Sequence, residues 1–248
     1  MTQPAPSSDR LERLRRLARA VPGGMAVGRW LHRLVNLDLR AIHRLIRAER
    51  GRLFQPFPDT AENRYPELFD ALAVRLAHLP APRILSFGCS SGAEVRALRR
   101  RLPSAQITGL DLNPRVLATA RRADRHPAST YRHAAAPDSA DRYDAILALA
   151  IFRHGALEAE RPASCAAILR FAQVDRAITG LDACLVPGGW LAIHHSHFRF
   201  ADTWAAAGYD ADPLLLPGQQ PAEPLYGPDN QRLAAPEVLP VLYCKQPR

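Results

Sequence analysis

The sequence contains no hydrophobic run long enough to cross a bilayer. Its longest apolar stretch, Ala145 to Phe152, has eight residues, whereas a spanning helix needs about 20. The first ten residues, MTQPAPSSDR, are polar and precede no apolar run, so they do not resemble a secretory leader. Only four cysteines are present, and their spacing matches neither a CxxC pair nor a zinc site. We therefore expect a cytoplasmic protein with reduced thiols and no bound metal.

Lysine is nearly absent as well, since Lys245 is the only one among 33 basic residues. The net charge of +9 is concentrated in residues 10–52, which hold twelve arginines and three acids, while the rest of the chain is balanced. This distribution argues against a nucleic-acid-binding domain, and the basic segment lacks the interleaved aromatic residues of single-strand binders. We expect a helical cap with solvated arginines; docking to an acidic partner or a membrane surface is the alternative.

Two kinds of hydrophobic periodicity divide the chain. Residues 1–80 contain amphipathic stretches, which predict a basic α-helical N-terminal extension. Residues 81–248 alternate short β-type runs with helical stretches, which predicts an α/β, Rossmann-like domain with a mostly parallel sheet. Helices are expected near 11–21, 27–50, 65–79, 92–101, 114–123 and 163–185, and strands near 83–87, 106–110, 130–133, 143–149 and 189–195.

The turn after the first of these strands, FGCSSG, has a composition typical of a nucleotide-binding loop. It places Ser90 and Ala93 where a dinucleotide loop has its second and third glycines, and the chain has no Gly-Lys-Ser/Thr of a P-loop. Asp111 ends the second strand, 19 residues after Gly92, where a carboxylate can accept hydrogen bonds from both ribose hydroxyls. A ribose site without a pyrophosphate cradle favours a nucleoside ligand that has no phosphates; an ordinary turn without ligand is the alternative.

Four stretches in order, ILSFGCSSG, ITGLDLNP, YDAILAL and LVPGGWLAI, resemble the landmarks of the class I S-adenosylmethionine (SAM) dependent methyltransferases. They lie within residues 83–197, which are under half of the chain. The resemblance implies SAM as the cofactor and a seven-stranded sheet with a final antiparallel hairpin, whose end a strand near 238–246 would supply. It also implies the SAM contacts: Gly88, Cys89, Ser90 and Gly92 along the methionine moiety, Asp111 at the ribose, Leu112 against the adenine, and Leu149 and Ala150 on the far side.

The chain departs from the family pattern at two positions. Ser86 stands where the family commonly has an acid that contacts the SAM amino group. Ser86 can still accept one hydrogen bond but carries no charge, so we expect SAM affinity to be lower by about 1–2 kcal/mol. After the third strand, where many members have an acid for the adenine amino group, the chain offers only Asp138, displaced along the sequence.

Residues that act on the methyl acceptor should follow the fourth and fifth strands, because the enzyme must mainly align nucleophile, methyl group and sulfur. After the fourth strand, Arg153 and His154 are the candidate catalytic residues, with His154 either a base or an ordinary loop histidine. After the fifth, HHSHFRF offers three histidines for packing or a substrate hydrogen bond. Its Arg199, like Arg153, either binds an acidic substrate or forms a surface ion pair.

The proline-rich stretch 213–231 is either a substrate loop or a wrapping tail. Its candidate side chains for substrate contact are Tyr226, Asp229 and Asn230.

Three functions remain open from the sequence. The first is a SAM-dependent methyltransferase acting on a small molecule. The second is a protein carboxyl (glutamate) methyltransferase, because NRYPELFDAL, CSSGAE and PGGWLAIHHSH are similar to the chemotaxis receptor methyltransferases, although the paired Glu of those enzymes is Ala93–Glu94 here. The third is a non-catalytic SAM-binding protein, which Ser86 motivates. A nicotinamide oxidoreductase is disfavoured by the glycine pattern.

Overall fold

The computed structural model describes residues 37–49, 51–56 and 60–247. Contacts between Cα atoms divide the chain into two units, Met1–Ala48 and Glu49–Arg248. In the first unit the described helix is α3 (Leu37–Ala48), which falls within the helix expected over 27–50; the helix expected near 11–21 lies outside the described residues. The second unit already includes helix α4 (Pro66–Leu76), whereas the sequence suggested a boundary near residue 80.

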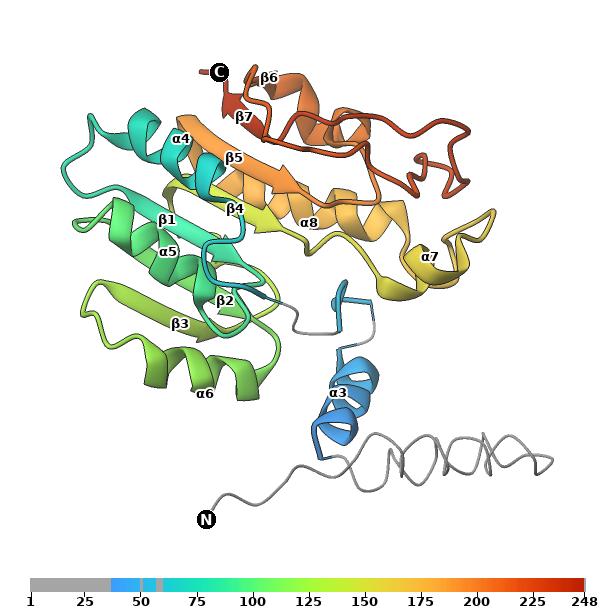
Figure 1. The fold of residues 1–248 in the computed structure, drawn as a ribbon, viewed down its shortest axis with the longest axis horizontal. Coiled ribbons are helices and arrows are strands. Elements are labelled where there is room, and N and C mark those ends of the chain that lie inside the picture. The colour runs from blue at the N-terminus through green and yellow to red at the C-terminus, as the bar shows by residue number, and fades with distance from the viewer. Residues whose placement is uncertain (1–36, 50, 57–59, 248) are drawn as a thin grey trace, which may run out of the picture. The chain divides into compact units, whose positions relative to one another are not determined.

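The second unit is built on one seven-stranded sheet, which confirms the predicted α/β, Rossmann-like fold (Figure 1). The strand order is β3-β2-β1-β4-β5-β7-β6. The five strands expected from the sequence pair in parallel, and β7 is antiparallel to both of its neighbours. The strands are β1 (Arg83–Phe87), β2 (Gln106–Asp111), β3 (Ser129–His133), β4 (Tyr143–Leu149), β5 (Leu185–His194), β6 (Tyr209–Ala211) and β7 (Leu242–Lys245).

The C-terminal strand expected near 238–246 is present as β7, and it pairs antiparallel with β6 as the expected final hairpin requires. β7 does not end the sheet but lies between β5 and β6, and the three-residue strand β6 forms the edge. A strand of three residues is too short to show a period in the sequence.

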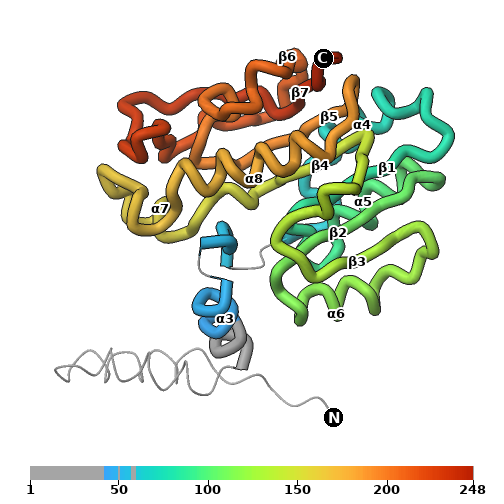
Figure 2. The backbone as a smooth tube through the Cα atoms, turned by 180° about the vertical axis from the view of Figure 1, so that it is seen from behind, coloured from blue at the N-terminus to red at the C-terminus, as the bar shows by residue number. Residues whose placement is uncertain are grey.

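Helices cover both faces of the sheet, as the alternating pattern predicted. On one face, α4 and α5 (Ala93–Arg101) pack with α6 (Pro114–Ala123) against the apolar residues of β1, β2 and β4 that point to that side. On the other face, α8 (Phe171–Cys184) packs against the alternate residues of the same strands. Figure 2, which views the sheet from behind, places α8 in front of it. Because β1 and β4 are buried on both sides, their sequences are mostly apolar, with Arg83, Ser86 and Asp144 as the exceptions.

Two helical predictions differ in detail from the structure. The helix expected over 163–185 begins only at Phe171, and a short helix that was not expected, α7 (Gly155–Glu160), follows β4. Two 3₁₀ turns, Phe200–Asp202 and Trp204–Gly208, follow β5. None of the helices in the described part of the chain is long and apolar enough to cross a membrane.

Candidate active site

The loop after β1 turns through three residues with positive φ. These are Gly88, Ser90 and Gly92, with φ of 77°, 50° and 77°. A Cβ atom on Gly88 would lie 2.7 Å from Ile151 Cδ1, and one on Gly92 would lie 2.7 Å from the Tyr131 hydroxyl. The backbone N–H groups of Gly88 and Cys89 both donate to the Leu110 carbonyl at 2.9 Å. The glycines are therefore required by close packing as well as by backbone conformation.

Asp111 closes this loop from the end of β2. Its Oδ2 accepts a hydrogen bond from Ser90 N at 2.9 Å, and its Oδ1 accepts one from Asn113 N at 2.7 Å. Burial raises the pKa of Asp111, and the two N–H groups oppose that rise. Because each carboxylate oxygen can accept a second hydrogen bond, both remain able to receive a ribose hydroxyl. The structure thus brings together the loop and the acid that the sequence paired.

Ser86 is fully buried and donates a hydrogen bond to Glu94 Oε1 at 2.6 Å. Glu94 lies in the first turn of α5. Burial raises the pKa of Glu94 to about 7, and the hydrogen bond from Ser86 works against that rise. Among the described residues no cation forms an ion pair with Glu94. A carboxylate thus stands beside the position where the family commonly has an acid, supplied from eight residues further along the chain.

A small cavity lies beside Asp111. Its lining includes Leu112, Ile151 and the segment Arg52–Gln55, and its volume is about 40 Å³, room for only a few water molecules. Phe54 in that segment packs edge-on against Phe152, with ring centroids 5.3 Å apart. The segment therefore fills much of the space next to the Asp111 carboxylate.

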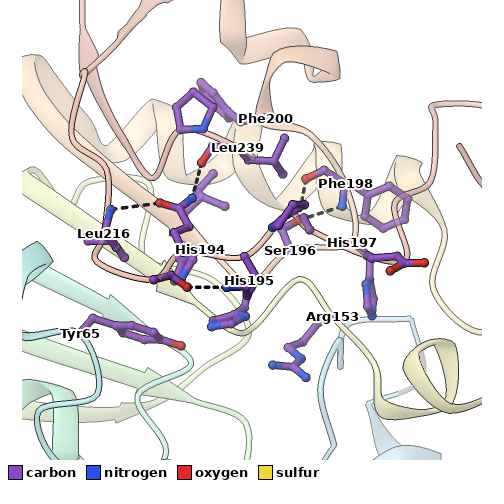
Figure 3. A pocket seen from close by; sticks show the side chains of 18 of the residues that line it. Tyr65, Arg153, His194, His195, Ser196, His197, Phe198, Phe200, Leu216 and Leu239 are labelled. Atoms are coloured by element: carbon purple, nitrogen blue, oxygen red, sulfur yellow. Dashed lines mark hydrogen bonds between the residues drawn. The ribbon is translucent and has the colours of Figure 1, made fainter. Parts of the chain in front are cut away.

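A larger cavity of about 350 Å³ opens at the carboxyl ends of β4 and β5 (Figure 3). Figure 3 shows Tyr65, His195 and Arg153 along the same side of it, from three separate parts of the chain. Ala150 and His195, which directly follow β4 and β5, have positive φ of 55° and 49°. Non-glycine residues in this conformation are strained and concentrate at functional sites. The volume lies in the range of small-molecule sites.

The three histidines after β5 are neutral in this site. Burial and the neighbouring His195 lower the pKa of His194 to about 4. Burial, Arg153 and Arg64 together lower the pKa of His195, and burial lowers that of His197. A carbonyl lies at each ring nitrogen of His197, that of Pro224 at 3.0 Å from Nδ1 and that of His154 at 3.3 Å from Nε2, and the neutral ring can donate to one of the two. Within the described residues no three metal-ligating side chains converge on one point.

The two candidate catalytic residues have different places. Arg153 lines the larger cavity, and one end of its guanidinium pairs with Glu158. His154 does not line it: its Nδ1 accepts a hydrogen bond from Ala156 N at 3.2 Å and so caps α7. Burial lowers the pKa of His154.

The other sequence candidates mostly lie outside both cavities. Arg199 pairs with Asp202 and Glu237 and does not line the larger cavity. Of the proline-rich stretch, Leu216–Glu223 lines that cavity. Tyr226 is fully buried and Asn230 Oδ1 accepts from Phe171 N at 2.7 Å, so these two side chains hold the fold. The remaining candidates, Asp138 and Asp229, hydrogen-bond to backbone N–H groups in their own turns.

Two residues of the site were missed by the sequence reasoning. Glu94 was seen only as part of an incomplete Glu pair, although its position in the first helical turn, two residues after Gly92, could have marked it. Tyr65 precedes helix α4, and no sequence signal distinguished it from a packing residue.

Buried polar atoms without a hydrogen-bond partner concentrate here. In the described part of the chain there are four, and three of them are Ser90 Oγ, Tyr65 Oη and Arg153 Nε. Ser90 lies in the loop after β1, and the other two residues line the larger cavity. Since buried polar groups are nearly always satisfied, their clustering indicates a polar ligand. The carboxylates of Asp111 and Glu94 fit the ribose hydroxyls and the ammonium group of SAM, and the Ser90 hydroxyl fits its methionine moiety.

The comparison with known families agrees with this geometry, since a family model described as a methyltransferase domain matches residues 85–191. Residues 85–191 therefore carry a methyltransferase domain, in agreement with the resemblance to the class I SAM-dependent methyltransferases. The matched region runs from β1 into β5 and includes the loop, Glu94 and Asp111. The resemblance deduced from the four sequence stretches is thereby confirmed.

Two curated relatives each match about half of this chain. Over 131 residues it is 37% identical to the biotin biosynthesis bifunctional protein BioCD of Bordetella avium, covering 50% of this chain and 24% of that protein. Over 123 residues it is 35% identical to a trans-aconitate 2-methyltransferase of an Acidovorax species, covering 49% and 41%. The chain thus spans less than half the length of the curated relatives it matches. Among solved structures, the plantazolicin methyltransferase BpumL with SAH aligns at 17% identity and a TM-score of 0.43, covering 75% and 62%.

Proposed function

We propose that this chain binds SAM and transfers its methyl group to a small-molecule acceptor. The observation that carries the proposal is the closed arrangement of Asp111 with the loop after β1, in which the Ser90 N–H donates to the carboxylate at 2.9 Å. This arrangement supports a ribose at Asp111 and a polar tail along Gly88–Gly92. When bound, SAM supplies an activated methyl group on a sulfonium.

The residues of this chain would bind the cofactor at three points. Asp111 accepts from the ribose hydroxyls, and Leu112 and Ile151 lie against the base. Glu94, held by Ser86, pairs with the ammonium group. The loop's buried Ser90 Oγ gains the partner that it now lacks. Because the cavity beside Asp111 is small, the segment Arg52–Gln55 has to withdraw as the nucleoside enters.

A small acceptor is favoured over a protein side chain by the shape of the larger cavity. Residues Leu216–Glu223 pass along one side of it, so its opening to solvent is restricted. Three of the similar proteins are named trans-aconitate 2-methyltransferases, a name that gives a small molecule as the acceptor. The same arrangement argues against the chemotaxis-like alternative, because a methylated glutamate on a folded protein needs an open approach.

The test is a calorimetric titration of the full chain with SAM and with SAH. We expect micromolar binding of both, lost in Asp111→Ala because the ribose loses its acceptor, and kept in Asp70→Ala. Asp70 is exposed on α4, where it pairs with Arg101, and it lies in neither cavity. No binding at millimolar ligand would refute the proposal.

A second measurement separates enzyme from non-catalytic binder. Labelled SAM is incubated with the chain and mixed small molecules, and methylated products are collected. Binding with no transfer to any acceptor would favour a SAM-binding protein without activity, and base-labile label in protein would favour the carboxyl methyltransferase.

A further inference from the structure

The polar side of the larger cavity has the character of a site for an anion. Arg153 and Arg64 both line it, and both act on the pKa of His195 as nearby positive charges. They act on the pKa of Tyr65 in the same sense. From this geometry we infer that the acceptor is a small carboxylic acid and that the methyl group is transferred to its carboxylate oxygen. The inference rests on the proposed function and specifies its substrate class.

Arg153 has capacity to bind such a group. One terminal nitrogen of its guanidinium pairs with Glu158, but Nε is buried and has no partner. The Tyr65 hydroxyl is also buried without a hydrogen-bond partner, and the Arg64 guanidinium lies over the Tyr65 ring, 6.0 Å from its centroid. A carboxylate is an acceptor-only group with two oxygens, and so it satisfies both donors at once.

The acids of the cavity do not oppose this reading. Glu158 is the ion-pair partner of Arg153. Glu223 is exposed and pairs with Arg161, outside the lining, and Glu67 is exposed on α4. Of these acids, Glu158 is thus the one beside Arg153 and His195, and the Arg153 guanidinium already balances its charge.

The histidines favour a carboxylate over an alcohol or an amine. A hydroxyl or ammonium acceptor must lose a proton, which requires a base matched to the working pH. The pKa values of His194 and His195 are both lowered, so these imidazoles are weak bases. The same arginines that weaken His195 as a base stabilise an acceptor that is already an anion.

The reaction then balances without a base. A lone pair of the carboxylate oxygen forms a bond to the methyl carbon, the carbon–sulfur bond of SAM breaks, and sulfur keeps that electron pair. The products are a neutral methyl ester and SAH, and no proton moves. The rest of the cavity wall is largely apolar, with Leu216, Leu239, Pro240 and Tyr243, so the acid should have an apolar body.

The experiment measures acceptor binding to the SAH-loaded full chain by ligand-observed NMR. Benzoate, phenylacetate and octanoate are compared with their primary amides and alcohols, which keep the carbon skeleton but lack the charge. We expect the acids to bind about tenfold or more tightly than their amides, because a charged hydrogen bond is lost in the amide. Incubation with SAM should then give methyl esters, recognised by release of methanol in mild base.

Two variants assign the preference to Arg153. Arg153→Met should abolish the preference for acid over amide, whereas Arg100→Met should retain it. Arg100 is a matched control, since it is a surface arginine on α5 paired with Glu62 and lines neither cavity. Equal binding of acids and amides, no binding of any acid at millimolar concentration, or methylation of alcohols instead would overturn the inference. SAH binding is measured first in the same sample, so its loss would be recognised as failure of the proposed function itself.

Discussion

At the scale of single residues, the most informative group is the Glu94 carboxyl. It is buried beside Ser86, accepts one hydrogen bond of 2.6 Å, and has a pKa raised to about 7. A carboxylate in this condition is costly to ionise unless a cation joins it. The ammonium group of SAM would be that cation. The ionised Glu94 would then destabilise the free protein but stabilise the complex with SAM.

Replacing Glu94 by Gln should weaken SAM binding about tenfold, the effect of one charged hydrogen bond. In the wild type, affinity should rise from about pH 5.5 to about 7.5, because below the raised pKa a proton must leave Glu94 before the ammonium can pair. The variant should lack that rise. Titration calorimetry measures both, with 5′-methylthioadenosine as the control ligand, since it has no ammonium and should bind both proteins equally. Equal loss for the two ligands would contradict the assignment.

The same substitution should stabilise the free protein at high pH. The folded-state pKa of Glu94, about 7, lies above its reference value of 4.5. The folded state therefore holds a proton that the unfolded state has lost, and stability falls as pH rises from 4.5 to 7. Glu94→Gln removes this dependence, so its melting temperature should exceed that of the wild type at about pH 8 and approach it near about pH 4. If the difference in melting temperature between the wild type and Glu94→Gln did not change with pH, the pKa of Glu94 would not be raised in the folded state.

The residues that the sequence located best are those tied to backbone geometry. Gly88, Gly92 and Asp111 follow from strand ends and turn composition, and those features are local in the chain. Glu94 and Tyr65 depend on contacts with Ser86 and with the ends of β4 and β5, so their places follow from tertiary packing. For His154 the sequence predicted the position after β4 correctly but not the role of the side chain. Its ring caps α7, a helix too short to be recognised from the sequence.

At the scale of elements, the loop after β1 and helix α8 offer a matched pair of glycines. Gly88 has φ of 77° and no space for a Cβ, whereas Gly180 lies in α8, where an added Cβ would meet nothing within 4 Å. Gly88→Ala should cost about 1–3 kcal/mol of unfolding free energy through backbone strain, and it should weaken SAM binding as the loop shifts. Gly180→Ala should be neutral or stabilising by up to about 1 kcal/mol. Urea unfolding compares them; equal effects would mean that the loop conformation is not required.

The sequence predicted those helices and strands correctly whose apolar pattern extends over the whole element, and it was wrong where the pattern is short. The five parallel strands and α5 and α6 match their expected ranges closely, because each carries a full apolar pattern. The structure contradicts the expectation that helix begins at 163. Residues 161–170 form turns, with Cys165 N bonded to the Asn230 carbonyl at 3.0 Å, a partner remote in the sequence.

At the scale of the whole molecule, the two cavities described above differ in the room that they offer a ligand. The larger cavity has a volume of about 350 Å³, whereas the cavity beside Asp111 has only about 40 Å³ because the segment Arg52–Gln55 lines it. Binding of a nucleoside must therefore displace part of a packed core, including the contact of Phe54 with Phe152. The protein should bind SAM less tightly than its contacts alone would allow, by the free energy of moving this segment.

Phe54→Ala tests this coupling. Removing the ring should destabilise the free protein by about 3–5 kcal/mol, yet it should lower the Kd for SAM, because the contact that the cofactor displaces is already gone. Phe171→Ala is the control: Phe171 is a core residue of similar burial that packs on Phe198 and lines neither cavity. It should lose stability with no change in Kd. If Phe54→Ala instead weakens SAM binding, the ring contacts the bound nucleoside, and Arg52–Gln55 is part of the site and not an obstacle to it.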